Sequence, residues 1–153
     1  LEFENSISSI DYKKFNLRVD NIKNTTNLLL ENIKKAKKKI IGYGAATKGN
    51  IVLNHCGINS DKIPMICDEN EEKLSRYTPG SNIKIISKNE MRKLNPDYLL
   101  VLIWSFKSEV IKQEVNYLKK GGKLIFHLPF LHIVDKKNYK HHLKENFEAF
   151  SYK

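Results

Sequence analysis

Hydrophobic and polar positions follow two different periods along the 153-residue chain. From Ile10 to about Lys37, apolar residues recur at steps of three and four, which predicts one long amphipathic helix. Its apolar stripe consists of Tyr12, Phe15, Val19, Ile22, Leu29 and Ile33. Asp11 is suited to cap the start, and a run of lysines from Lys34 lies where the helix dipole favours cations.

Beyond this helix, short apolar runs alternate with helical segments. Strands are predicted at 39–42, 63–67, 83–86, 97–104 and 123–128, and helices at 46–55, 87–94 and 107–119. Such alternation is typical of parallel strands joined by right-handed crossovers. The sequence therefore predicts an α/β fold, a Rossmann-like doubly wound parallel sheet of about five strands in the order 3-2-1-4-5.

The chain divides into three parts of one expected domain. Residues 1–38 form the helical lead-in, residues 39–129 the Rossmann-like domain, and residues 130–153 a Lys- and His-rich tail. The tail is expected to be a surface helix packed by Phe147, Phe150 and Tyr152. Because the first residue is Leu1 and not Met, we expect the chain to be a piece of a longer protein.

Composition narrows the class of protein. Cys56 and Cys67 are too few for a disulfide framework and lack metal-site spacing, so they are expected to be reduced core residues in a cytoplasmic protein. No apolar run approaches the roughly 20 residues that cross a bilayer, so no membrane contact is expected. The net charge of +10 comes from 27 basic residues, of which only Arg18, Arg76 and Arg92 are arginines. Most of this charge is expected to be a solvated face, and nucleic acid is not an expected partner.

The stretch around Gly42 and Gly44 resembles the start of a nucleotide-binding sheet, where a strand enters a glycine turn and then a helix. Gly42 is expected to make the tight turn, and Gly44 to let a phosphate approach the backbone amides that begin the helix. Lys48 can reach that phosphate, and Asp68 at the end of the second strand can accept from a ribose hydroxyl. Alternatively, the two glycines only make a strand-to-helix turn.

The dinucleotide fingerprint is incomplete, because Thr47 stands where the third glycine belongs. NAD is therefore supported only weakly, and a nucleoside diphosphate is the preferred ligand. No histidine is paired with a carboxylate or cysteine at metal-ligand spacing, so neither a metal nor a catalytic residue is assigned.

Four ordered segments go beyond this general pattern. They are YGAATKGNIVLNHCGI (43–58), DENEEKLSRYTPGSNI (68–83), NPDYLLVLIWSFKSEVI (95–111) and GGKLIFHLP (121–129). With them, the chain resembles the C-terminal domain of the S-adenosylmethionine-dependent sugar C-methyltransferases over about residues 4–129. Members of that family carry a zinc-binding domain and a methyltransferase domain upstream, so S-adenosylmethionine and zinc are expected there and not on this chain.

The resemblance implies a domain that binds and positions a nucleoside-diphosphate sugar and is inactive alone. Its implied ligand residues are Gly42, Tyr43, Gly44, Ala45 and Lys48 on the nucleotide side, Arg76 and Tyr77 on a loop over the pocket, and Trp104 at the end of the fourth strand. Ser105 replaces the asparagine usual in the family. Glu69 replaces an arginine, which makes the entrance of the expected ligand pocket less cationic.

The same side chains also allow purely structural roles. Tyr43 could pack on the neighbouring turn, Arg76 could pair with Glu71 or Glu72, and Trp104 could complete the core instead of stacking on a base. The expected partner is a methyltransferase domain, in the same chain or as a separate subunit that this chain serves as a free-standing module. An NAD(P)-dependent oxidoreductase and a lysine-rich nucleic-acid binder are the remaining alternatives.

Overall fold

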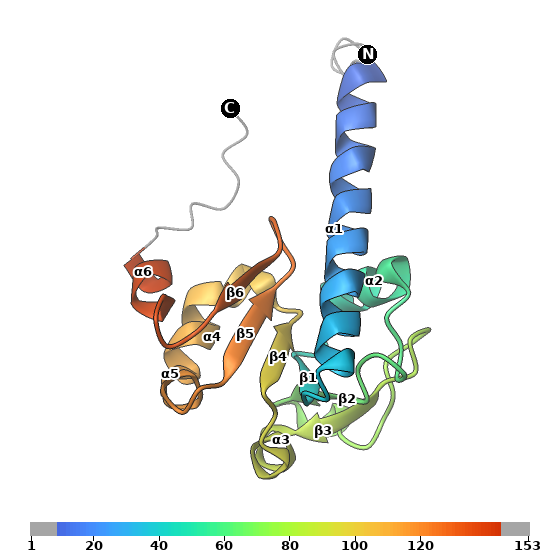
Figure 1. The fold of residues 1–153 in the computed structure, drawn as a ribbon. Helices are drawn as coiled ribbons and strands as arrows, with labels where there is room; N and C mark the ends of the chain where they lie inside the picture. Colours follow the sequence, from blue (N-terminus) through green and yellow to red (C-terminus); the bar gives the residue numbers. More distant parts are fainter. Residues whose placement is uncertain (1–8, 145–153) are drawn as a thin grey trace.

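The structure, a computed structural model, describes residues 9–144 and is built on one six-stranded sheet. The strands are β1 (Ile40–Tyr43), β2 (Met65–Asp68), β3 (Lys84–Ser87), β4 (Tyr98–Val101), β5 (Lys123–Phe126) and β6 (His132–Val134). Their order is β3-β2-β1-β4-β5-β6, with β1 to β5 parallel and β6 antiparallel to β5 (Figure 1). The α/β fold and the predicted order of the first five strands are confirmed.

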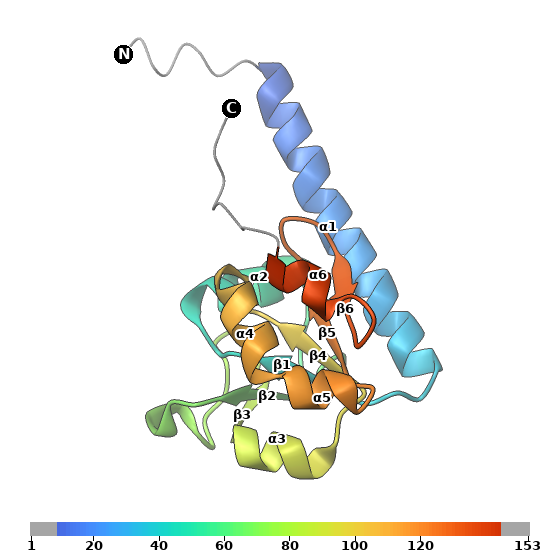
Figure 2. The same cartoon turned by 90° about the vertical axis from the view of Figure 1, so that its left-hand side faces the viewer.

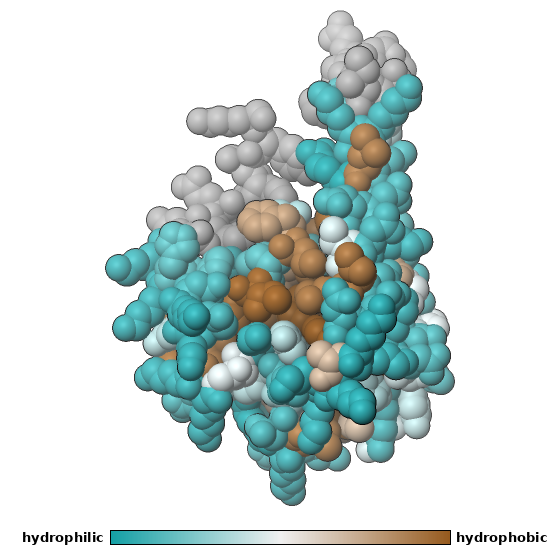
Figure 3. Space-filling model, viewed as in Figure 1, coloured by the Kyte–Doolittle hydropathy of each residue, from teal (hydrophilic) through white to brown (hydrophobic). Residues whose placement is uncertain are grey.

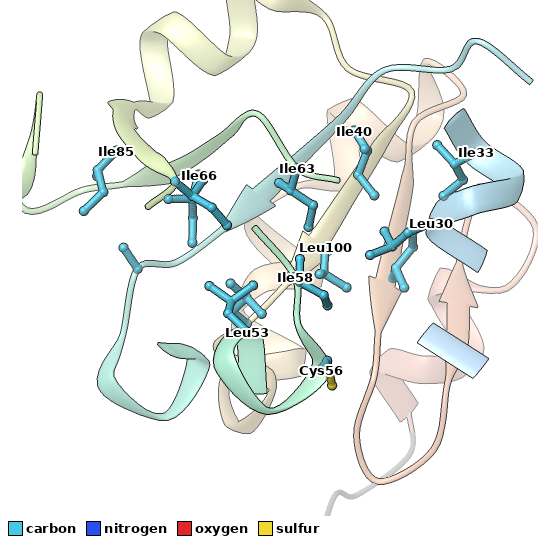
Figure 4. Close-up of a cluster of buried hydrophobic side chains, with 14 residues drawn as sticks. Leu30, Ile33, Ile40, Leu53, Cys56, Ile58, Ile63, Ile66, Ile85 and Leu100 are labelled. Carbon is cyan, nitrogen blue, oxygen red and sulfur yellow. The ribbon is translucent and has the colours of Figure 1, made fainter. Parts of the chain in front are cut away.

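Helices cover both faces of the sheet, as Figures 1 and 2 show. They are α1 (Ser9–Lys35), α2 (Thr47–Cys56), α3 (Lys88–Leu94), α4 (Lys107–Gln113), α5 (Val115–Lys119) and α6 (Tyr139–Lys144). Leu30 and Ile33 of α1 and Leu53 of α2 pack on one face in a cluster with Ile66 and Leu100 (Figure 4). Helices α3 to α6 contribute to a second cluster on the other face. The described chain thus has a core on each side of the sheet.

Local chemistry sets the helix ends. Gly57 adopts a left-handed conformation with φ 62° and ends α2. Ser87 and Glu90 form the expected capping box at the start of α3, since each side chain bonds the other residue's backbone N–H. The predicted helix 107–119 is interrupted at Glu114 and forms two shorter helices, α4 and α5.

The region after β5 departs from the prediction. Instead of running directly into a helix, the chain turns back and adds β6 to the edge of the sheet, with Phe126 opposite His132. This strand was missed because three residues, His132, Ile133 and Val134, give too short an alternation to recognise. Helix α6 follows, and the packing expected of Phe147, Phe150 and Tyr152 lies outside the described residues.

Helix α1 packs on the domain through only part of its length. Thr26, Leu30 and Ile33 are buried, and the Asn27 side chain donates to the carbonyl of Cys56 at 2.8 Å. Tyr12 and Phe15 are 59% and 56% exposed, although they belong to the same predicted apolar stripe. Figures 1 and 2 show the first half of α1 extending away from the sheet.

Candidate functional site at the carboxyl edge of the sheet

A cavity of about 300 Å³ lies at the carboxyl ends of β1, β2 and β4. Its lining includes Tyr43, Gly44, Asp68, Lys88, Phe106 and Gln113. The strand order reverses between β1 and β4, and open parallel sheets bind ligands at such a reversal. Larger cavities elsewhere lie away from this edge, at Asn95–Asp97 and at Lys38–Ile41. The position, more than the volume, makes this cavity the candidate site.

The two loop glycines have different tasks. Gly44 makes the turn, with φ +88°, and a Cβ there would lie 2.6 Å from the Ile103 side chain. Gly42 was expected to make the turn, but it lies inside β1, where a Cβ would be 3.0 Å from the side chain of Ile66. Only Gly44 therefore combines a positive φ with a place at the cavity.

Gly49 supplies the close packing that the incomplete fingerprint seemed to lack. It lies in the first turn of α2, and a Cβ there would approach the Cβ of Leu102 to 2.8 Å. This contact brings α2 against the chain that follows β4. The third glycine is therefore present in function, two residues later than the dinucleotide pattern places it.

Asp68 holds the glycine loop to the end of β2. Its Oδ2 accepts from the backbone N–H of Ala45 at 2.7 Å and lies 3.3 Å from the ammonium nitrogen of Lys73. Its Oδ1 accepts from the N–H of Asn70 at 2.9 Å. Lys73 also donates to the carbonyl of Ala45 at 3.0 Å. Both oxygens thus have protein partners, which weakens the interpretation of Asp68 as a ribose ligand.

The start of α2 presents its backbone amides at the same edge. Its N-cap residue, Ala46, has no side chain that can accept from them. Lys48 is exposed in the first turn. Unsatisfied amides and a nearby ammonium group are a combination that favours an anion such as phosphate.

Tyr43 is buried, with 1% of its surface exposed. Its hydroxyl lies 3.1 Å from the side-chain oxygens of both Gln113 and Glu114, and the Glu114 carboxylate is also paired with Arg92. Burial raises the pKa of Tyr43, and Glu114 raises it further. The structural role considered for Tyr43 is therefore the one that these contacts support, although its ring still borders the cavity.

Arg76 and Tyr77 lie along the outer edge of β3 instead of over the cavity. The carbonyl of Arg76 accepts from the N–H of Ile85, and Tyr77 pairs with Lys84. Both side chains are exposed, and among residues 9–144 Arg76 forms no ion pair with Glu71 or Glu72. Neither residue is part of the cavity lining, and backbone pairing along an edge leaves no side-chain pattern in the sequence from which this could be predicted.

Trp104 lies beyond β4, which ends at Val101, and begins a short 3-10 turn. Its ring is half-buried and meets the ring of His127 edge-on, with centroids 5.1 Å apart. His127 is fully buried at the end of β5, and within the described chain its ring nitrogens make no hydrogen bond of ordinary geometry. Burial lowers the pKa of His127 to about 4, an effect that the nearby Val101 carbonyl partly offsets.

Three polar residues of the cavity, Lys88, Glu109 and Gln113, were missed by the sequence prediction. Lys88 bonds the side chains of Glu69 and Gln113 and lies 4.8 Å from the centroid of the Tyr43 ring. All three belong to α3 or α4, which pack on the face of the sheet opposite α1 and α2, so the glycine motif gives no signal for them. With Glu69 and Glu109 also in the lining, the cavity suits hydroxyl and N–H donors better than phosphate.

Comparison with known proteins places the chain in a family. Residues 2–129 match the family described as the C-methyltransferase C-terminal domain. The chain belongs to this family. Among its relatives is the C-methyltransferase NovU of Streptomyces niveus, 31% identical over 118 residues, which are 77% of this chain and 28% of NovU. The C-terminal domain described here therefore spans little more than a quarter of that relative's length.

Metal-binding and membrane-spanning features are absent from residues 9–144 of this C-methyltransferase C-terminal domain. No group of three or more His, Cys, Asp or Glu side chains could hold a metal ion there. None of the described helices is both long and apolar enough to span a membrane.

Proposed function

We propose that this domain binds a nucleoside-diphosphate sugar and holds it for methyl transfer by another domain or subunit. The observation that carries the proposal is the cavity at the strand-order reversal, next to the start of α2, in a C-methyltransferase C-terminal domain. On this proposal the chain alone has no methyltransferase activity, and its contribution to rate is the placement of the sugar.

The charges at the edge suggest which part of the ligand lies where. A diphosphate would meet the amides at the start of α2 and the Lys48 ammonium group. The cavity beyond Gly44 offers Glu69, Glu109 and Gln113 as acceptors, which suit the hydroxyls of a deoxy sugar or the N–H groups of a base. Gly44, with no side chain, lies between these two regions.

Calorimetric titration with dTDP, UDP, GDP, CDP, S-adenosylmethionine and NAD tests the proposal. One nucleoside diphosphate is expected to bind saturably, and Lys48→Ala to weaken it about tenfold, close to 1.4 kcal/mol. Lys119→Ala is the matched control, because Lys119 is an exposed lysine at the end of α5. Binding of NAD in preference to the diphosphates, or no binding at all, would overturn the proposal.

A free-standing module that serves a separate methyltransferase subunit would use the same site. The two arrangements are distinguished by the length of the natural reading frame and not by the titration. An oxidoreductase role is less favoured because Asp68, its expected ribose ligand, is engaged by Ala45, Asn70 and Lys73.

A further inference from the structure

An apolar surface lies over β6 on the side of the sheet that α1 and α2 cover. Leu131 and Ile133 are half-buried against the core cluster that also includes Leu29 of α1. The neighbouring Phe130 does not join them, because its ring lies 5.1 Å from that of His132, which stacks on Phe126 of the other cluster. Figure 3 shows this region as a continuous brown area beside α1. None of the helices within residues 9–144 covers it, although doubly wound sheets usually carry helices across both faces.

Helix α1 extends the same surface away from the domain. Phe15, Ile22 and Leu29 are seven residues apart, so they lie nearly in line along one side of the helix. Leu29 and Ile22 are half-buried, whereas Phe15 is 56% exposed. We call the surface formed by Phe15, Ile22, Leu29, Leu131 and Ile133 the α1–β6 face.

Contiguous apolar surface bordered by polar residues marks an interaction site in a water-exposed protein. On α1, Lys14 and Arg18 are exposed along one side of the line of Phe15 and Ile22, beside the exposed Asp11. A fitting partner therefore has an apolar strip with acidic side chains along its border. A second copy of this chain fits poorly, because each copy has a net charge of +10.

The lengths of the relatives identify a better occupant. The match covers 28% of NovU and is to a domain described as C-terminal, so most of that relative lies outside the matched part. Helix α1 is the first described element and points its free end away from the sheet, on the side where a preceding domain would join. We propose that the α1–β6 face docks the methyltransferase part of the enzyme, which rests on the proposed role of this domain beside such a part.

The probe for the test is NovU from which the region that matches this chain has been removed. It is titrated against the full 153-residue chain. The unaltered chain is expected to bind saturably, and Phe15→Glu to weaken binding at least tenfold. The Phe15 side chain is 56% exposed, so the variant keeps the core intact. Leu17→Glu is the matched control: Leu17 is 69% exposed on the opposite side of α1 and should leave binding unchanged.

The proposal would be overturned if the shortened NovU did not bind at about 100 μM, or if Leu17→Glu weakened its binding as much as Phe15→Glu does. A dimer of the chain that Phe15→Glu dissociates would identify a second copy as the occupant. Binding only after removal of residues 145–153 would identify the chain's own tail as the occupant. If the shortened NovU does not unfold cooperatively, this chain is fused to it in place of the matched region. The same substitutions are then compared within that fusion protein. Trypsin cleavage of α1 that increases in Phe15→Glu but not in Leu17→Glu then reports lost docking.

Nucleotide titration of the same variants separates the two proposals. Phe15→Glu and Leu17→Glu are expected to bind the nucleoside diphosphate as tightly as the unaltered chain. If no nucleotide binds while docking is intact and sensitive to Phe15, only the proposed function fails. If nucleotide binds and docking is absent, only the docking surface fails.

Discussion

The carboxylate of Asp68 accepts a hydrogen bond from the backbone N–H of Ala45, with its Oδ2 2.7 Å from the nitrogen. This contact ties the glycine loop after β1 to the end of β2, and Lys73 reinforces it by bonding both Asp68 and the Ala45 carbonyl. The loop is therefore held in its conformation by the protein alone. A ligand arriving there would spend little binding free energy on ordering it.

Asp68→Ala is expected to lower the free energy of unfolding by about 2–3 kcal/mol, because it removes charge-assisted hydrogen bonds at a largely buried carboxylate. Urea unfolding followed by circular dichroism measures the change. Asp20→Ala is the control, since Asp20 is exposed on α1 and should change stability by less than about 0.5 kcal/mol. Equal midpoints for the two variants would show that the Ala45 contact is unimportant for folding.

Gly49→Ala is expected to destabilise the domain by about 1–3 kcal/mol, although alanine is the better helix former. The added Cβ would lie 2.8 Å from the Cβ of Leu102. Leu102 is buried, and its Cβ is bonded directly to the backbone, so that atom cannot move aside freely. Thermal unfolding checks this. Ile51→Ala, at a 66% exposed position of the same helix, should be nearly neutral. A stabilised Gly49→Ala variant would contradict the packing argument.

Stability is expected to fall below neutral pH partly because of His127. Its pKa is about 4 in the folded chain, below the ordinary value of 6.5, so the unfolded chain binds more protons between these values. The contribution is complete above pH 6.5 and is lost as the pH falls towards 4, by about 3 kcal/mol at most. Urea unfolding at several pH values measures the slope.

His127→Phe is the matched variant for that measurement. It should remove the His127 part of the slope and be at least as stable as the original chain at pH 7, because carbon replaces two buried nitrogens that make no hydrogen bond of ordinary geometry. The same acid loss in both proteins would assign it to the carboxylates instead.

Cys67 is expected to be inert in the folded chain. Burial raises its pKa to about 12, so the reactive thiolate is on the order of 10³ times scarcer than for an ordinary thiol at neutral pH. Cys56 is also buried with a raised pKa. Labelling with a thiol reagent that absorbs on reaction should be slow until urea unfolds the chain. Rapid labelling of Cys67 in the native protein would disprove its burial.

The fold was largely predictable because its signal is periodic. The apolar runs that became β1, β2, β4 and β5 are buried on both faces, and their alternation with helices determines the sheet order. The edge strand β6 was missed, since a half-covered strand of three residues leaves only a brief pattern. The helix over 107–119 broke at Glu114, whose buried pairing with Arg92 is a contact between distant segments.

The candidate site was predictable only in its location. Gly44 and the start of α2 follow from the strand, turn and helix pattern, and they lie where that pattern puts them. The roles of Asp68 and Tyr43 depend on hydrogen bonds with Ala45 and Glu114, which no local spacing reveals. The substrate roles assigned to the nine site residues stay predictions until a ligand is measured.

A tilt of helix α1 would move its two ends by very different distances. Its 27 residues span about 40 Å at 1.5 Å per residue, while its buried contacts lie near one end. A tilt of about 10° at that end displaces the other by about 7 Å. Small changes in the packing of Leu30 and Ile33 would therefore be amplified along the helix. The shape of the core thus sets the position of the start of α1, and with it the position of any partner bound there.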